Sequence, residues 1–200
     1  MAPEIQKLLN LTSLTLAPLE SDLNEALSRW EQDQNSQFWS RTAFRCLSAA
    51  IEARLFAFRK MAEQLGAANF VQFTKGELEI LTEQRQVAST VGPATVKPKF
   101  LQFPDTVRES FRLFGKSVSV NVNVNYGDEG FSSLCDTFKV RNRLMHPKGP
   151  FDVQVSPKDI DTANQGVKWF NLTYRDVLDQ CQTGIGLRIG AIAIEPSTGT

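Results

Sequence analysis

Residues 38–65, FWSRTAFRCLSAAIEARLFAFRKMAEQL, carry the clearest helical pattern in the chain. Apolar side chains recur there every three or four positions, and neither proline nor glycine interrupts them before Gly66. The apolar face consists of Trp39, Ala43, Cys46, Leu47, Ala50, Ile51, Leu55, Phe58, Ala62 and Leu65. A stripe of this length predicts a long core helix, and with it a mainly α protein.

Weaker patterns of the same period place further helices around this one. Leu19, Leu23, Leu27 and Trp30 follow Pro18, and a polar break then leads to Ser36, a candidate N-cap for the long helix. Gly92-Pro93 and Lys97-Pro98 indicate a loop. The sequence thus predicts a loop over 88–98 and helices over 18–33, 76–86, 105–116, 131–146 and 157–182.

One stretch has a different period. Apolar and asparagine residues alternate over 118–126, which is the pattern of a strand. A strand needs a partner, and 86–91 or 185–194 are the candidates. The expectation is a single domain over 1–200: a mainly α helical bundle with a small strand or hairpin insertion, a helical core over about 18–182 and a partly flexible tail over 183–200.

Composition narrows the function classes. Lys plus Arg and Asp plus Glu number 22 each in 200 residues, so no overall basic field indicates nucleic acid. Three scattered cysteines and a single histidine exclude a disulfide framework and a histidine-rich metal site. We therefore expect no metal or other cofactor. No apolar run is long enough to span a membrane, which favours a cytoplasmic protein that does not engage a membrane.

The candidate functional side chains lie in residues 131–147. Apolar positions at Phe131, Leu134 and Phe138 continue, at helical spacing, into Arg141, Asn142 and His146. Burying an unpaired guanidinium costs far more than burying a leucine gains, so this face should border a cleft or a second subunit. No acid occurs between Asp136 and Asp152, whereas four basic residues do: Lys139, Arg141, Arg143 and Lys148. That local excess of positive charge suits a phosphate.

Arg141-Asn-Arg-Leu-Met-His146 resembles the R-x-x-x-x-H motif of HEPN domains, in which a polar residue follows the arginine. The resemblance extends in loose outline over residues 18–182. It implies an all-helical fold that dimerises. It also implies a metal-independent endoribonuclease of the kind found in toxin–antitoxin or anti-phage systems, with an antitoxin or other regulatory protein as a partner.

On this hypothesis His146 is the acid or base, and Arg141 clamps the phosphate. Asn142 orients either His146 or the phosphate. Arg143, Lys139 and Lys148 would contact the RNA backbone. Glu52 would hold Arg141; its alternative is a solvated carboxylate that bridges Arg45 and Arg59. One histidine cannot readily act as acid and base at once, so a symmetric dimer would supply two. The products would be a 2′,3′-cyclic phosphate and a 5′-hydroxyl.

Two other classes stay open. One is a HEPN-like module without catalysis that binds a nucleotide, RNA or a protein. The other is a purely structural helical adaptor, in which His146 only satisfies the last carbonyls of its helix.

Overall fold

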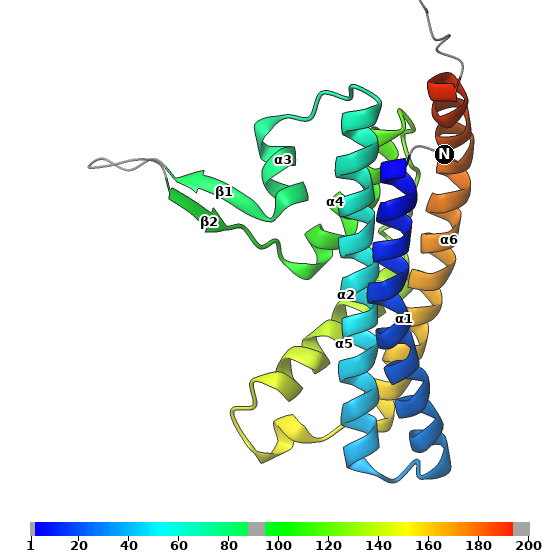
Figure 1. The fold of residues 1–200 in the computed structure, drawn as a ribbon. Helices are drawn as coiled ribbons and strands as arrows, with labels where there is room; N and C mark the ends of the chain where they lie inside the picture. The colour runs from blue at the N-terminus through cyan, green and yellow to red at the C-terminus, as the bar shows by residue number, and fades with distance from the viewer. Residues whose placement is uncertain (1–2, 88–94, 194–200) are drawn as a thin grey trace, which may run out of the picture. The chain divides into compact units, whose positions relative to one another are not determined.

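The protein is mainly α, as the sequence predicts (Figure 1). The computed structural model describes residues 3–87 and 95–193. In chain order the elements are α1 (Pro3–Gln32), α2 (Gln37–Ala68), α3 (Lys75–Thr82), β1 (Gln84–Val87), β2 (Thr95–Pro98), α4 (Phe103–Ser117), α5 (Glu129–Met145), the 3-10 helix η1 (Pro150–Val153) and α6 (Pro157–Ala193).

The described chain divides into two compact units. The first combines Leu55–Val122 with the N-terminal end of α1 and the C-terminal end of α6, and the second combines Asn10–Arg54 with Asn123–Asp176. Three helices, α1, α2 and α6, contribute to both units. Each unit has a hydrophobic core of its own.

In the first unit the core forms around Phe58 of α2. Its ring stacks on Phe114 of α4 with the centroids 4.4 Å apart, and it meets Phe111 edge-on at 5.7 Å. Leu55, Leu81 and the three phenylalanines are almost fully buried. The C-terminal part of the predicted α2 stripe is therefore core, as expected.

Beside that core, Glu77 at the start of α3 accepts hydrogen bonds from three residues. Lys116 Nζ and Arg112 Nη1, both on α4, donate to its carboxylate at 2.6 and 2.8 Å. The backbone N–H of Thr74 donates to it as well, within a capping box. Burial alone would raise the pKa of Glu77, but these hydrogen bonds and the Lys116 charge outweigh it and lower the pKa to about 2.

In the second unit, one cluster joins α2, α5 and α6. Phe44, Val140, Leu144, Val155 and Ala163 are buried together, with Leu47 and Ile160 packed against them. In the first third of α6, Gly166 lies against the α5 backbone so closely that a Cβ there would come within 2.6 Å of the Leu134 Cα. Close approach at Gly166 therefore positions α5, the helix that carries the Arg-Asn-x-x-x-His segment.

The strand predicted over 118–126 is wrong. Ser119 has φ +61°, and the N–H of Val120 donates to the Gly115 carbonyl, so the chain first caps α4. The even-numbered side chains from Val120 to Tyr126 are half-buried and the odd-numbered ones exposed, as the alternation indicates. A period of two fixes which side chains face inward, but it does not supply a strand partner. In the described chain this segment belongs to no ladder.

The β insertion lies elsewhere, partly in the segment predicted as a loop. Glu83 takes φ +55° and ends α3, earlier than predicted, and Gln84–Val87 then pairs antiparallel with Thr95–Pro98 (Figure 1). The register joins Gln84 to Pro98 and Val87 to Thr95. Residues 88–94 of the predicted loop lie outside the described residues.

Two helices are longer than predicted. α1 begins at Pro3 and continues through Pro18, which was expected to start it; a proline inside a helix removes one hydrogen bond without always ending the helix. α6 runs to Ala193 rather than 182. No proline occurs from 158 to 195 to stop it, and Gly184 lies close to the Val118 carbonyl. The end of the expected flexible tail, 194–200, lies outside the described residues.

We predict opposite effects for two glycine-to-alanine changes. Gly166→Ala destabilises the protein by about 1–3 kcal/mol, because the new methyl group meets the α5 backbone. Gly76→Ala in α3, where nothing lies within 4 Å, stabilises it by about 0.4–1 kcal/mol. Urea unfolding measures both free energies; equal effects of the two changes would contradict the close approach at Gly166.

Glu77 makes the free energy of unfolding depend on pH in the acidic range. Its folded-state pKa lies below the ordinary value of 4.5, so its stabilisation is present above that pH and is lost as the pH falls toward 2. We predict that Glu77→Gln costs roughly 3 kcal/mol at pH 7 and almost nothing at pH 2. Urea titrations across this range measure the difference between wild type and variant; a difference independent of pH would refute the prediction.

Candidate active site

The candidate site lies at the C-terminal end of α5. Asp128 caps the start of this helix by accepting the N–H of Gly130, and Phe131, Leu134 and Phe138 bury its inner face. The side chains of Asn142, Met145 and His146 are exposed, whereas Arg141 is half-buried between them and the core face. The predicted stripe therefore runs from the core to the surface along the helix, which places its polar end where solvent or a ligand can reach it.

Arg141 is held by two oxygens. Its Nη2 donates to Oε2 of Glu52 on α2 at 3.2 Å, and its Nη1 donates to Oδ1 of Asn142 at 3.0 Å. The Arg141 side chain is 29% exposed and that of Glu52 45%. The expected Arg141–Glu52 contact is thus present, while Arg59 donates to Ser110 and Glu83 instead. At this exposure the pair contributes about 0–1 kcal/mol to stability, so its main effect is to position the guanidinium.

His146 is the residue at which α5 ends. Its backbone N–H donates to the Asn142 carbonyl at 2.9 Å, and Pro147 follows. The imidazole is exposed, and no residue in the described ranges forms a hydrogen bond with the ring. Asn142 contacts His146 through its backbone only, because its side-chain oxygen accepts from Arg141. The structure thus leaves an imidazole open to solvent five residues beyond a fixed guanidinium.

Arg143 is fully occupied by the chain itself. Its Nη1 donates to the carbonyls of Phe151, Asp152 and Gln154, the last at 2.7 Å, and its Nη2 donates to Oδ2 of Asp159 at 3.1 Å. These contacts join the end of α5 to η1 and to the start of α6. We therefore assign Arg143 to positioning the connection that follows His146 rather than to RNA.

The two lysines remain at the surface. Lys139 forms an ion pair with Asp136 at 2.7 Å, and that hydrogen bond raises the pKa of the lysine. Lys148 is exposed, and its backbone N–H donates to the Asp152 carboxylate at 2.7 Å. The Asp152 carboxylate also accepts the N–H of Gly149, so it organises the turn before η1.

In the folded protein, acidic side chains pair with most of the basic side chains of the segment from Lys139 to Lys148. Asp136, Glu52 and Asp159 form ion pairs with Lys139, Arg141 and Arg143, respectively. Glu52 and Asp159 come from other helices, and of these two acids only Glu52 was expected as a partner of this segment. Asp159 had a sequence signal: with Ser156 it forms the S-x-x-D capping pattern at the start of α6.

Other chemistries find little support in the described residues. They contain no group of three or more His, Cys, Asp or Glu side chains placed to hold a metal ion. Burial raises the pKa of the Cys181 thiol to about 11, which keeps it protonated at neutral pH. Across the same residues, no helix combines the length and the apolar character that crossing a membrane requires.

Comparisons with protein-family models, with curated proteins and with solved structures found no match to this chain. The assignment of the site therefore depends on the motif and on its geometry.

We predict that Arg143→Lys destabilises the protein by about 1–3 kcal/mol, because lysine keeps the charge but cannot reach several carbonyls from one planar group. Lys139→Ala, which removes an exposed charge four residues earlier, changes stability by less than about 0.5 kcal/mol. Urea unfolding measures both. Hydrogen exchange over 150–156 should also accelerate in Arg143→Lys alone; unchanged exchange there would contradict the positioning role.

Proposed function

We propose that this protein is a metal-independent endoribonuclease of HEPN type, and that two copies of the chain build its active site. The observation that carries the proposal is the exposed His146 imidazole at the end of α5, five residues after an arginine that Glu52 and Asn142 hold in place. The toxin or anti-phage role, and an antitoxin or other regulatory partner, follow from the same resemblance and belong to the proposal.

The chemistry needs a base, an acid and a cation. A base takes the proton of the ribose 2′-hydroxyl, whose oxygen then attacks the phosphorus. The 5′-oxygen leaves as it receives a proton from an acid, which gives a 2′,3′-cyclic phosphate and a 5′-hydroxyl. His146 serves as base or acid, and Arg141 stabilises the negative charge that builds up on the phosphate. Asn142 and Glu52 are positioning residues for that guanidinium.

The need for two copies follows from the histidine count. The chain has a single histidine, and the mechanism uses one group as base and another as acid in the same step. A two-fold axis that brings the α5 ends of two chains together would supply two imidazoles and two guanidiniums. The exposed Met145 beside His146 offers apolar surface for such a contact.

RNA affinity should depend on few charges. Three of the four basic side chains between 139 and 148 already form ion pairs with acids of the chain. Few released counterions mean that the affinity falls only gently with added salt. Lys148 and Lys139 are the exposed cations that could meet the RNA backbone.

We predict that the purified full-length protein cleaves RNA in excess EDTA and leaves cyclic-phosphate ends. His146→Ala should lower the rate roughly 100- to 10,000-fold, because it removes both the acid and the base. Lys168→Ala, which removes an exposed cation from α6, should cleave at the wild-type rate. Gel assays with end-group analysis measure the three rates; equal cleavage by wild type and His146→Ala would sink the proposal.

A separate experiment tests whether the active site is a composite site, that is, one built from two copies of the chain. If both histidines of a dimer are needed, equal mixing of wild-type and His146→Ala chains lowers activity to about a quarter, since only about a quarter of the dimers then carry two. If each chain cleaves independently with its own histidine, about half of the activity remains. A monomer at micromolar concentration in sedimentation analysis would also contradict the composite site.

The ion-paired cations favour a second candidate, a HEPN-like module that binds RNA, a nucleotide or a protein without cleaving RNA. It predicts that the wild type leaves RNA intact and that His146→Ala changes neither dimerisation nor the dissociation constant for RNA. Filter binding on the same variants separates the two functions.

A further inference from the structure

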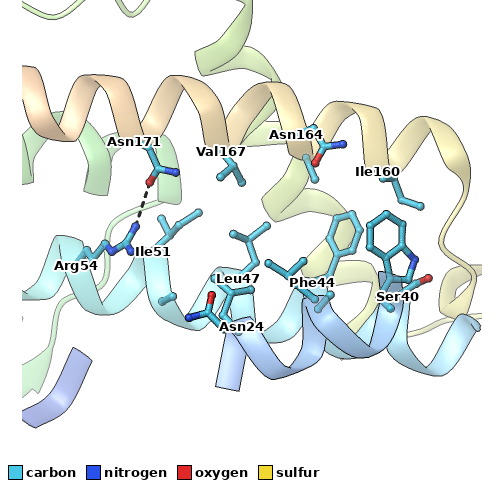
Figure 2. Close-up of a pocket in the computed structure, with 16 residues that line it drawn as sticks. Asn24, Ser40, Phe44, Leu47, Ile51, Arg54, Ile160, Asn164, Val167 and Asn171 are labelled. Atoms are coloured by element: carbon cyan, nitrogen blue, oxygen red, sulfur yellow. Dashed lines mark hydrogen bonds between the residues drawn. The ribbon is translucent and has the colours of Figure 1, made fainter. Parts of the chain in front are cut away.

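A groove in the second unit opens between α1, α2 and α6, and neither the motif nor the proposed cleavage uses it. We call it the α1–α2–α6 groove. It encloses a cavity of about 340 Å³, within the size range of small-molecule sites. Phe44, Leu47 and Ile51 of α2 face Ile160 and Val167 of α6 across it (Figure 2). The lining is therefore mainly aliphatic along its length.

Polar groups lie at the ends and on the rim of this groove. Arg54 and Asn171 meet at one end, where Arg54 Nη1 donates to Asn171 Oδ1 at 3.1 Å, and Ser40 lies at the other (Figure 2). Asn24 on α1 and Asn164 on α6 are exposed on the two sides, and the described residues offer neither side-chain amide a hydrogen-bond partner. The rim can therefore both donate to and accept from a ligand.

The lining holds one further unsatisfied donor. Trp30 Nε1 is buried, and no acceptor for it occurs among the described residues. An oxygen supplied by a ligand is one way to satisfy such a donor.

The groove is too small for a docked helix or protein, because its cavity measures only about 340 Å³. Its floor is already closed: Ala50 and Ile51 are 1% exposed and Phe44 5%. A stable protein interface buries about 800 Å² on each partner, which this floor cannot provide. Along α2, however, the groove extends from Ser40 to Arg54, which at 1.5 Å per residue is about 21 Å. A narrow, long and apolar space fits an extended aliphatic chain.

The charges of the groove lining determine which head group an aliphatic ligand can carry. Arg54 at the groove end donates to Glu20 Oε1 at 2.9 Å, so its charge is compensated within the unit. The other polar lining groups, Ser40 and the asparagines, are uncharged. A carboxylate or an ammonium head would find no counter-charge and would lose hydration on entry.

We propose that the α1–α2–α6 groove binds a slender aliphatic molecule with an uncharged, hydrogen-bonding head group such as an alcohol. Its chain lies over the closed floor against Leu47, Ile160 and Val167, the apolar lining residues of α2 and α6 that are partly exposed, and its head group exchanges hydrogen bonds with the free rim amides. This inference does not depend on RNA cleavage.

The test titrates the full-length protein with three probes of equal chain length: decanol, decanoate and decyltrimethylammonium. Isothermal titration below the aggregation limit of each probe should show saturable binding of decanol. It should show at least tenfold weaker binding of the two ions. Binding of decanoate as tight as that of decanol, or no binding of any probe, would overturn the proposal.

A blocking variant and a matched control locate the site. Val167→Phe fills the groove and should abolish decanol binding, whereas Leu172→Phe, an exposed position on α6 outside the groove, should leave it unchanged. Unchanged binding by Val167→Phe would place the ligand elsewhere and overturn the proposal.

A second variant avoids any change to the core. Asn164 is exposed, so Asn164→Lys should fold, and it places a cation on the rim. The preference should then shift at least tenfold from decanol toward decanoate. Gln165→Lys, which adds the same charge to the next residue outside the groove, should keep the wild-type preference. Identical preferences in the two variants would overturn the assignment of the rim.

Discussion

The apolar stripe of α2 is the constraint on which both units depend. Phe44 and Leu47 enter the cluster that holds α5 and α6 in one unit, and Leu55 and Phe58 enter the core against α4 in the other. The helix extends from Gln37 to Ala68, so a single element of secondary structure contributes residues to two cores. It also provides Glu52, which lies beside the stripe and reaches Arg141. The candidate site thus derives its geometry from the same helix as the core.

Two half-buried guanidiniums, those of Arg141 and Arg143, explain most of the polar architecture near the site. Arg141 and Arg143 are two residues apart on α5, yet one contacts a single carboxylate and an amide at the surface, and the other is wrapped by three carbonyls and Asp159. Arg141 thus donates to two side chains, whereas the donors of Arg143 shape a turn. Two identical side chains in one motif therefore have separate physical tasks, set by which groups lie near each of them.

The sequence predicted what local periodicity determines and missed what depends on distant partners. The mainly α class, the α2 face and the Arg141–Glu52 contact could be predicted, because spacing along a helix decides which side chains share a face. The strand over 118–126 was wrong because Val and Asn alternation specifies burial but not pairing. The ion pair of Arg143 with Asp159 was not predicted, since Asp159 lies on α6, outside the basic segment from Lys139 to Lys148. The groove also combines residues from three separated segments.

Three of the four passages of the chain between the two units lie inside helices, namely α1, α2 and α6, and only the passage at Val122 lies between helices. Neither unit is therefore a continuous piece of sequence, and no pair of cuts releases one of them intact. A gene fusion or recombination event that moved residues 55–122 alone would leave that unit without its portions of α1 and α6. The two units therefore cannot be exchanged as modules between proteins in the way that tandem domains can.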